Sequence, residues 1–194
     1  MMKKTIEKLT EAAKEKIKKD GELFPIGIIV KDGVPISIRS FSFNDSRDKA
    51  KEIFTAGMVG RVLGADGLIL INDVTMKSVD KADFDKKTGK ITKEEVKNCK
   101  GNVVDAVAVI YFSFDGKEQY SSLTPYKKNG DEIEFEESSV SSDEMGGMFS
   151  EYLQNGWSVC GKMLEENPNL HNELGMLYRN VSNGFDQIFN PSMN

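Results

Sequence analysis

The stretch from Asn102 to Glu136 decides the fold and reads NVVDAVAVIYFSFDGKEQYSSLTPYKKNGDEIEFE. It opens with an almost unbroken apolar run, Val103 to Phe112, which is typical of a strand buried on both faces of a sheet. Two dipeptides, Asp115-Gly116 and Asn129-Gly130, divide the rest of the stretch, and such dipeptides favour tight hairpin turns. The stretch therefore predicts three consecutive strands of an antiparallel sheet, arranged as a meander.

Three earlier strands are expected to join this meander. Residues 23–30 and 34–43 flank Asp32-Gly33, which suits a type I′ hairpin turn because both residue types tolerate a positive φ. Residues 67–76 begin with an unbroken apolar run, so we place them at the centre of the sheet. Pro25 and Pro35 cannot donate ladder hydrogen bonds, and we expect them at strand ends, at a bulge or on an edge strand.

Two helices are expected in the same region. Residues 3–19 carry apolar side chains at three- and four-residue spacing between lysines and glutamates, which predicts an amphipathic helix lying on the sheet. A lysine-rich surface for a partner is the alternative, and the interleaved glutamates weaken it. A second helix is expected to follow the Asn44-Asp45-Ser46 segment, which offers N-cap oxygens, and to run to Leu63, with Gly64 as its C-terminal cap. Its internal glycines, Gly57 and Gly60, are expected to let it approach the sheet closely.

The chain changes character after Ser138. Residues 131–151 hold many carboxylates and no lysine or arginine. Apolar residues at helical spacing follow as far as Leu164, and residues 167–169 (Asn-Pro-Asn) break that pattern. A second apolar series then runs from Leu170 to Phe189. We therefore expect a helical hairpin over residues 141–190.

These elements together predict an α+β fold. Its core is a mainly antiparallel sheet of five or six strands, with an N-terminal helix, a crossover helix and the C-terminal helical hairpin. We divide the chain into a sheet domain over residues 1–137, with a charged insertion at 77–101, and a helical appendage over residues 138–194.

Composition and charge exclude several classes of function. The chain has 194 residues, of which 26 are lysine or arginine and 31 are aspartate or glutamate, giving a formal net charge of −5. This acidic balance disfavours nucleic acid and anionic membranes as partners. Glutamates interrupt any signal-peptide core near the N-terminus, and the two cysteines are far apart, so we expect a cytoplasmic protein. With one histidine and no paired cysteines, neither a zinc site nor another cofactor is expected.

Two carboxylates are candidate catalytic residues. Asp73 lies late in the predicted central strand, and Asp105 lies early in the next buried strand. If these strands pair, the two carboxylates could hold Mg²⁺ and support a metal-assisted hydrolase. The alternative is that each carboxylate accepts backbone hydrogen bonds at a strand end.

A weaker metal candidate lies in the charged insertion. Residues 84–96 resemble the second half of an EF-hand calcium loop, with Asp83, Asp85 and Glu95 as candidate ligands. Lysines occupy positions where that loop requires oxygen ligands. A Thr-Gly turn followed by a short helix explains the segment equally well.

The predicted C-terminal helices are candidates for an interface. Their apolar stripes are rich in methionine and aromatic residues, which suit adaptable contact surfaces. The candidate interface residues are Met148, Phe149, Tyr152, Trp157 and Met163. The alternative is that this region simply covers an open face of the sheet.

Two resemblances bear on function. The element order over residues 3–137 resembles that of roadblock/profilin-like domains, which implies a non-catalytic protein that dimerises and regulates GTPases or assemblies. Residues 24–30, together with the segment from Gly64 to Met76, resemble small uncharacterised prokaryotic and phage proteins, which imply no activity. We therefore expect a non-catalytic protein–protein interaction or regulatory module. It would bind a protein partner, or a second copy as a homodimer, through its C-terminal helices.

Overall fold

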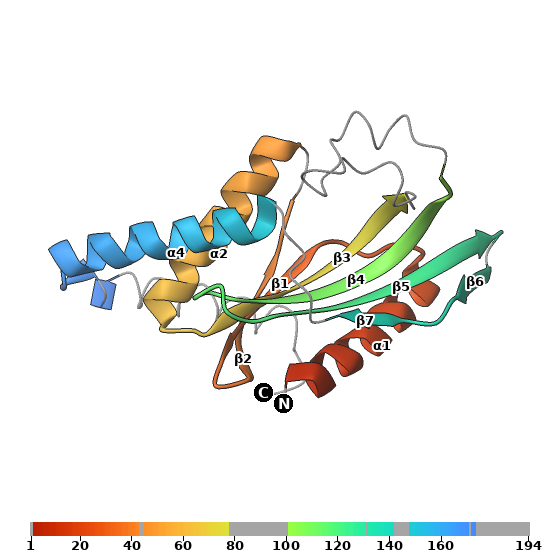
Figure 1. Ribbon diagram of the computed structural model, residues 1–194, viewed down its shortest axis with the longest axis horizontal. Helices are drawn as coiled ribbons and strands as arrows, with labels where there is room; N and C mark the ends of the chain where they lie inside the picture. The colour runs from red at the N-terminus through yellow and green to blue at the C-terminus, as the bar shows by residue number, and fades with distance from the viewer. Residues whose placement is uncertain are drawn as a thin grey trace, which may run out of the picture.

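A seven-stranded antiparallel sheet forms the centre of the protein, in the order β2-β1-β3-β4-β5-β6, with β7 also paired to β5 (Figure 1). The computed structural model describes residues 2–42, 45–77, 101–130, 132–141, 148–170 and 172–173. The strands are β1 (Ile26–Lys31), β2 (Val34–Ser40), β3 (Gly67–Lys77), β4 (Val103–Ser113), β5 (Gln119–Asn129), β6 (Glu132–Phe135) and β7 (Ser139–Ser141). The helices are α1 (Met2–Asp20), α2 (Ser46–Leu63) and α4 (Met148–Glu166). The predicted α+β class with a mainly antiparallel sheet is confirmed.

The two strands with the longest apolar runs lie at the centre, as their sequences predict. β3 pairs antiparallel with β4 along its whole length, from Gly67 opposite Ser113 to Lys77 opposite Val103. The edge position of β2 fits its Pro35, which lies at a register shift in the pairing with β1. The short strand β7 was not predicted, because three residues of the sequence Ser-Val-Ser carry no readable apolar alternation.

The hairpin turns differ in geometry. Asp32 and Gly33 both have positive φ, 52° and 74°, which confirms the predicted type I′ turn. At residues 115–116 only Gly116 has a positive φ, so that turn is not of the same kind. The Asp115 side chain accepts a hydrogen bond from the Lys117 N–H there, and this local bond favours a wider loop.

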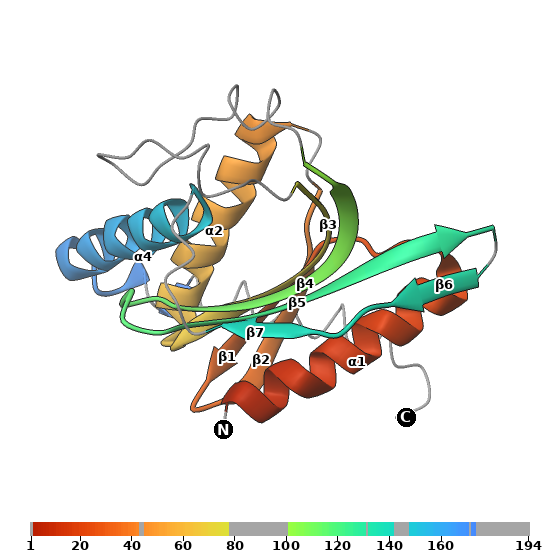
Figure 2. The ribbon, with the colours of Figure 1, turned by 45° about the vertical axis from the view of Figure 1, so that its right-hand side comes forward.

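The helices cover opposite faces of the curved sheet (Figure 2). α1 packs on one face, where Ile6 and Ile17 join a core with inward-facing residues of β1, β3 and β4. α2 packs on the other face, where Ile53 and Val59 join a second core with alternate residues of the same strands. The helix α4 contributes Leu153 to this second core and packs mainly along α2.

The contact between α2 and α4 depends on two glycines. A Cβ atom on Gly57 would lie 2.1 Å from the carbonyl oxygen of Leu153, and one on Gly156 would lie 2.0 Å from that of Phe54. The helix backbones therefore touch directly. We expected Gly57 to allow an approach to the sheet, and this was wrong because α4 occupies that face of α2. Gly60 does face the sheet layer, where it makes room for the ring of Phe114 at the end of β4.

The described residues test only some of the expectations for the insertion and the C-terminal region. α4 ends at Glu166, just before the predicted break at residues 167–169. The proposed second helix of the hairpin and the insertion lie largely outside the described residues. The division into two domains stays a prediction, although β7 extends the sheet beyond residue 137 by pairing with β5. No helix in the described part of the chain is long and apolar enough to span a membrane.

Candidate functional site

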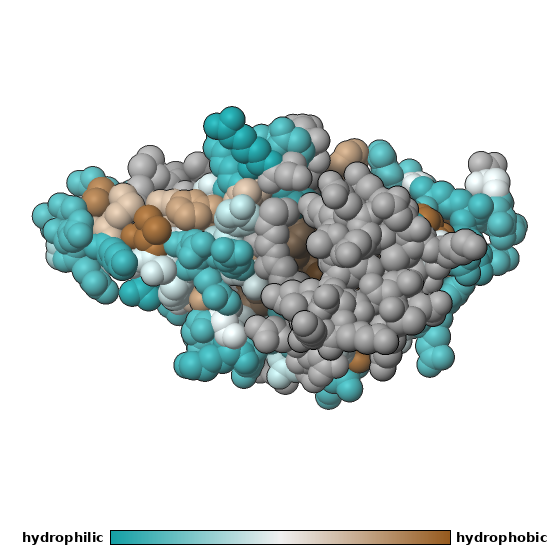
Figure 3. Space-filling view, turned by 45° about the horizontal axis from the view of Figure 1, so that its top comes forward, coloured by the Kyte–Doolittle hydropathy of each residue, from teal (hydrophilic) through white to brown (hydrophobic). Residues whose placement is uncertain are grey.

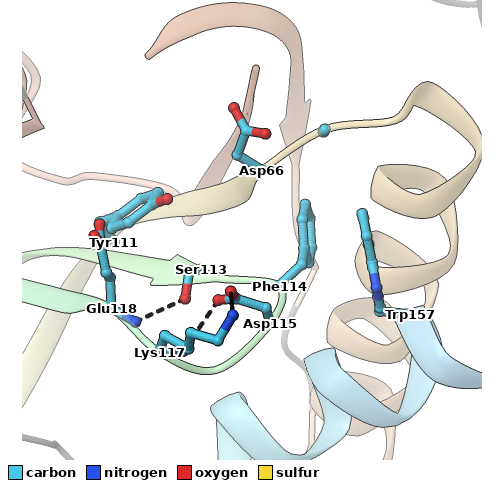
Figure 4. Close-up of a pocket in the computed structure, with 9 residues that line it drawn as sticks. Asp66, Tyr111, Ser113, Phe114, Asp115, Lys117, Glu118 and Trp157 are labelled. Atoms are coloured by element: carbon cyan, nitrogen blue, oxygen red, sulfur yellow. Dashed lines mark hydrogen bonds and ion pairs between the residues drawn. The ribbon is translucent and has the colours of Figure 1, made fainter. Parts of the chain in front are cut away.

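An acidic pocket lies where the turn between β4 and β5 meets the start of β3 and the middle of α4 (Figure 4). Its volume is about 330 Å³. Its lining comprises Ala65, Asp66, Tyr111, Ser113, Phe114, Asp115, Lys117, Glu118 and Trp157. We call this cavity the acidic pocket because three of these side chains are carboxylates and one is a lysine.

Backbone hydrogen bonds hold the floor of the acidic pocket in place. The Ser113 N–H donates to the Glu118 carbonyl at 2.9 Å, and the Glu118 N–H donates to the Ser113 hydroxyl at 2.8 Å. The Phe114 N–H donates to the Asp66 carbonyl at 2.9 Å. The Asp66 carboxylate in turn accepts a hydrogen bond from the Asp32 N–H. The turn, the start of β3 and the β1–β2 hairpin are thereby tied together.

An aromatic stack forms one wall of the acidic pocket. The Trp157 ring of α4 stacks on the Phe114 ring, with centroids 4.6 Å apart and an interplanar angle of 11°. The Arg61 guanidinium of α2 lies 5.0 Å from the centroid of the same Trp157 ring, within the range of a cation–π interaction. Trp157 is therefore held between α2 and the end of β4. Figure 4 shows both rings on the side of the cavity opposite Tyr111.

Electrostatics set the protonation of the lining. Burial, together with the negative charges of Glu118, Asp66 and Asp115, raises the pKa of Tyr111 to about 12. The pKa of Asp115 is lowered to about 2, first by the hydrogen bond from the Lys117 side chain and next by that from the Lys117 N–H. The same contact raises the pKa of Lys117. At neutral pH Tyr111 is therefore neutral while Asp115 and Lys117 are charged.

Two polar side chains of the acidic pocket form no hydrogen bond or ion pair with other described residues. Neither the Tyr111 hydroxyl nor the Glu118 carboxylate has a hydrogen-bond or ion-pair partner among the residues that the structure describes. By contrast, the carboxylates of Asp66 and Asp115 are both bonded. The pocket thus has both a donor and an acceptor to offer to a ligand.

The predicted pair Asp73 and Asp105 lies elsewhere on the sheet. Asp105 pairs with Thr75 in the β3–β4 ladder and with Tyr126 in the β4–β5 ladder. Thr75 donates a hydrogen bond to Asp105 at 3.0 Å, and the Tyr126 hydroxyl lies 2.9 Å from both carboxylate oxygens of Asp73. Burial raises the pKa of Asp73, the Tyr126 hydrogen bond opposes this, and the charge of Asp105 adds to it. The structure therefore places the two carboxylates on paired strands, where the charge of Asp105 acts on Asp73.

The described residues add no further ligand beside Asp73 and Asp105. Within the described residues, no group of three or more His, Cys, Asp or Glu side chains could hold one. The roles of Asp73 and Asp105 as catalytic groups stay predictions. The three ligands suggested in the insertion, Asp83, Asp85 and Glu95, lie outside the described residues.

The candidate interface residues divide between the inside and the outside of α4. Phe149, Tyr152 and Trp157 are partly buried against the core beneath α2. Met163 is 42% exposed, and Val159, on the same side of the helix, is 43% exposed. The space-filling view shows apolar surface over this end of the molecule (Figure 3). Met148 is the first residue of α4, and its side chain is outside the described part.

Sequence reasoning singled out only Trp157 among the residues of the acidic pocket. The pocket is built from segments around residues 66, 111–118 and 157, and the spacing of these segments in the sequence does not predict that they lie close together in the fold. The usable signal was the short segment Asp115-Gly116-Lys117-Glu118, which concentrates charge at one hairpin turn.

Comparison with known families shows a family for this chain. Residues 1–106 match the family described as bacteriophage lambda protein ea47. The chain belongs to this family. The match runs from α1 into β4 and bears out the expected resemblance to phage proteins. Tyr111, the turn and α4 follow the matched region, so the family assignment covers only the Asp66 side of the acidic pocket.

The other comparisons add no relative. No curated protein and no solved structure matches the chain. The resemblance to roadblock/profilin-like domains therefore remains one of element order. The family's description names no activity, so the functional argument depends on the site.

Proposed function

We propose that this protein is a non-catalytic protein–protein interaction module that holds a basic side chain of a partner protein in the acidic pocket. The observation that carries the proposal is the charge around Tyr111. Asp66, Asp115 and Glu118 all act on this hydroxyl, and within the lining only Lys117 offsets them. A concave site with such a balance attracts cations and steers their approach.

The protonation of the lining argues against acid–base catalysis. A general acid or base works best when its pKa lies near the pH of the reaction. In the acidic pocket the pKa values move away from neutral pH, since that of Tyr111 rises to about 12 and that of Asp115 falls to about 2. Fixed charges and neutral donors suit binding better than proton transfer.

The surroundings of the acidic pocket favour a protein as the ligand. The helix that supplies Trp157 also exposes Val159 and Met163. Exposed apolar side chains on a helix that lines a charged pocket favour a protein as the partner, because apolar and aromatic residues provide much of the binding energy at protein interfaces. A partner protein in the cytoplasm, as the cysteine usage suggests, is the simplest occupant, and a second copy of the chain is the alternative.

Trp157 provides the direct test because it is the only tryptophan. We would titrate the protein with two short serine-rich peptides that differ only in a central lysine or glutamate, and follow tryptophan fluorescence. The lysine peptide is expected to bind and the glutamate peptide to bind at least roughly tenfold more weakly, with the difference shrinking at high salt. Equal responses to both peptides, or none to either, would contradict the proposal.

A matched pair of variants locates the binding. Glu118→Gln removes one charge from the acidic pocket without changing shape, so affinity for the lysine peptide should fall roughly two- to fivefold. Glu132→Gln makes the same change on β6, far along the sheet, and should leave affinity unchanged. Sedimentation velocity at high protein concentration then identifies the partner class, because self-association that weakens in Glu118→Gln would indicate a second copy.

A metal-assisted hydrolase is the second candidate function. It is favoured by one observation, the placement of Asp73 and Asp105 on paired strands close enough for one charge to act on the other. Calorimetric titration with Mg²⁺ tests it. Saturable binding that disappears in Asp105→Asn would support the hydrolase over the interaction module.

A further inference from the structure

A second cavity lies against the acidic pocket and shares a wall with it. Its volume is about 460 Å³. Its lining comprises Arg61, Gly64, Ala65, Trp157, Gly161, Leu164 and Glu165. Ala65 and Trp157 line both cavities, so the tryptophan separates two neighbouring compartments.

The two cavities differ in chemistry. The lining of the second consists mostly of small or apolar residues, and its charged side chains, Arg61 and Glu165, have opposite signs. It therefore has no net charge, whereas the acidic pocket has three carboxylates against one ammonium group. A basic side chain suits one compartment, and an uncharged apolar side chain suits the other.

Glycine at position 161 is what leaves room in the second cavity. A Cβ atom on Gly161 would lie 3.2 Å from Nε of Arg61, so even an alanine would press on the guanidinium that covers Trp157. A larger side chain there would fill the cavity itself. Position 161 therefore controls access to the second cavity without touching the carboxylates of the first.

We infer that the two cavities form one groove for an extended partner segment with the pattern basic-x-apolar. The inference rests on the proposed function and specifies its partner. In an extended chain, residues i and i+2 point to the same side at a separation of roughly 7 Å. That spacing would let two such side chains pass on either side of the Trp157 ring. A short segment would bind in this form because isolated helices of a few residues are unstable in water.

Three peptides test the pattern, each a short serine-rich chain with Lys-Ser-Leu, Lys-Ser-Ser or Glu-Ser-Leu at its centre. Fluorescence of Trp157 reports on both compartments. The Lys-Ser-Leu peptide should bind roughly tenfold more tightly than Lys-Ser-Ser, as burial of a leucine side chain allows. Equal affinities for these two would overturn the inference and leave the proposed function standing. Equal affinities for Lys-Ser-Leu and Glu-Ser-Leu would overturn the proposed function instead.

Two variants assign each side chain of the peptide to its compartment. Gly161→Val should abolish the preference for leucine over serine while keeping the preference for lysine over glutamate. Glu118→Gln should reduce the preference for lysine over glutamate roughly two- to fivefold while keeping the preference for leucine over serine. If Gly161→Val fails to fold by circular dichroism, Leu164→Ala replaces it, because removing that apolar wall should also reduce the leucine preference. Leucine selectivity unchanged in the folded variant would contradict the groove.

Discussion

The two ends of β4 present the same chemical groups in different states. At its beginning, Asp105 lies near Asp73 and Tyr126, and at its end Tyr111 lies among Asp66, Asp115 and Glu118. Burial raises the pKa of both tyrosines. Yet the Tyr126 hydroxyl is bonded to both oxygens of Asp73, while that of Tyr111 has no partner within the described residues.

This difference between the two tyrosine hydroxyls distinguishes a group that stabilises the fold from one that can bind a ligand. A buried hydroxyl that is bonded to a carboxylate stabilises the fold, and breaking the bond leaves the carboxylate unsatisfied. Replacing a hydroxyl or a carboxylate that lines a cavity and has no partner should change stability little. Such a group is available to bind a ligand. We therefore assign the Asp73 end to stability and the acidic pocket to recognition.

The largest expected effect concerns the helix contact that supports the recognition end. Gly156→Ala places a Cβ atom on the Phe54 carbonyl oxygen, so α4 must move, and the loss of stability should be about 3 kcal/mol or more. Urea unfolding measures it. Asn155→Ala, at an exposed neighbouring position, is the control and should change stability by less than about 0.5 kcal/mol. Equal stability of the two variants would mean that the helix contact is not as close as described.

The tyrosines provide the sharpest test of the comparison itself. Tyr126→Phe removes the donor to Asp73 and should lower the free energy of unfolding by about 1–3 kcal/mol. Tyr111→Phe removes a hydroxyl without a described partner and should cost less than about 0.5 kcal/mol. The same urea unfolding experiment compares them. If the order were reversed, the two ends of β4 would have to exchange roles.

The contributions of Asp73 and Asp115 to folding stability should depend on pH in opposite directions. The pKa of Asp73 is raised in the folded protein, so the folded state binds this proton more readily than the unfolded state does. Stability from Asp73 should therefore fall as pH rises above the ordinary value of 3.8 and through the raised pKa, and Asp73→Asn should remove this dependence. The pKa of Asp115 is lowered to about 2, so its contribution should instead be lost as pH falls from 3.8 toward that value. Carbon-13 NMR titration of the carboxyl groups checks both directions, and a lowered pKa for Asp73 would contradict the assignment.

The smallest expected effect concerns the lysine of the acidic pocket. Lys117→Gln removes the only cation among the described lining residues, so affinity for the lysine peptide should rise roughly twofold, with no change in stability. Lys127→Gln, which breaks an equivalent exposed ion pair with Glu136, is the control. A loss of affinity in Lys117→Gln alone would show that Lys117 contacts the ligand directly.

The fold could be predicted further than the site, and particular residues explain why. Long apolar runs in β3 and β4 and the Asp32-Gly33 turn are local signals, because a buried strand and a tight turn each impose their own residue types. The neighbourhood of Asp73 and Asp105 followed from strand pairing. The packing of α4 on α2 did not, since the role of Gly57 and Gly156 depends on which helix arrives opposite them. The acidic pocket has the same limitation, because Asp66, Tyr111 and Trp157 come from three separate elements.

Two-dimensional NMR of the nitrogen-15 protein, titrated with the central-lysine peptide, tests the assignment of roles most directly. We predict shifts in the amides of residues 113–118 and in the indole N–H of Trp157, with those of Asp73, Thr75 and Asp105 unmoved. Shifts confined to the Asp73 end, or an unchanged spectrum at saturating peptide, would contradict the conclusion that the turn between β4 and β5 is where this protein binds its partner.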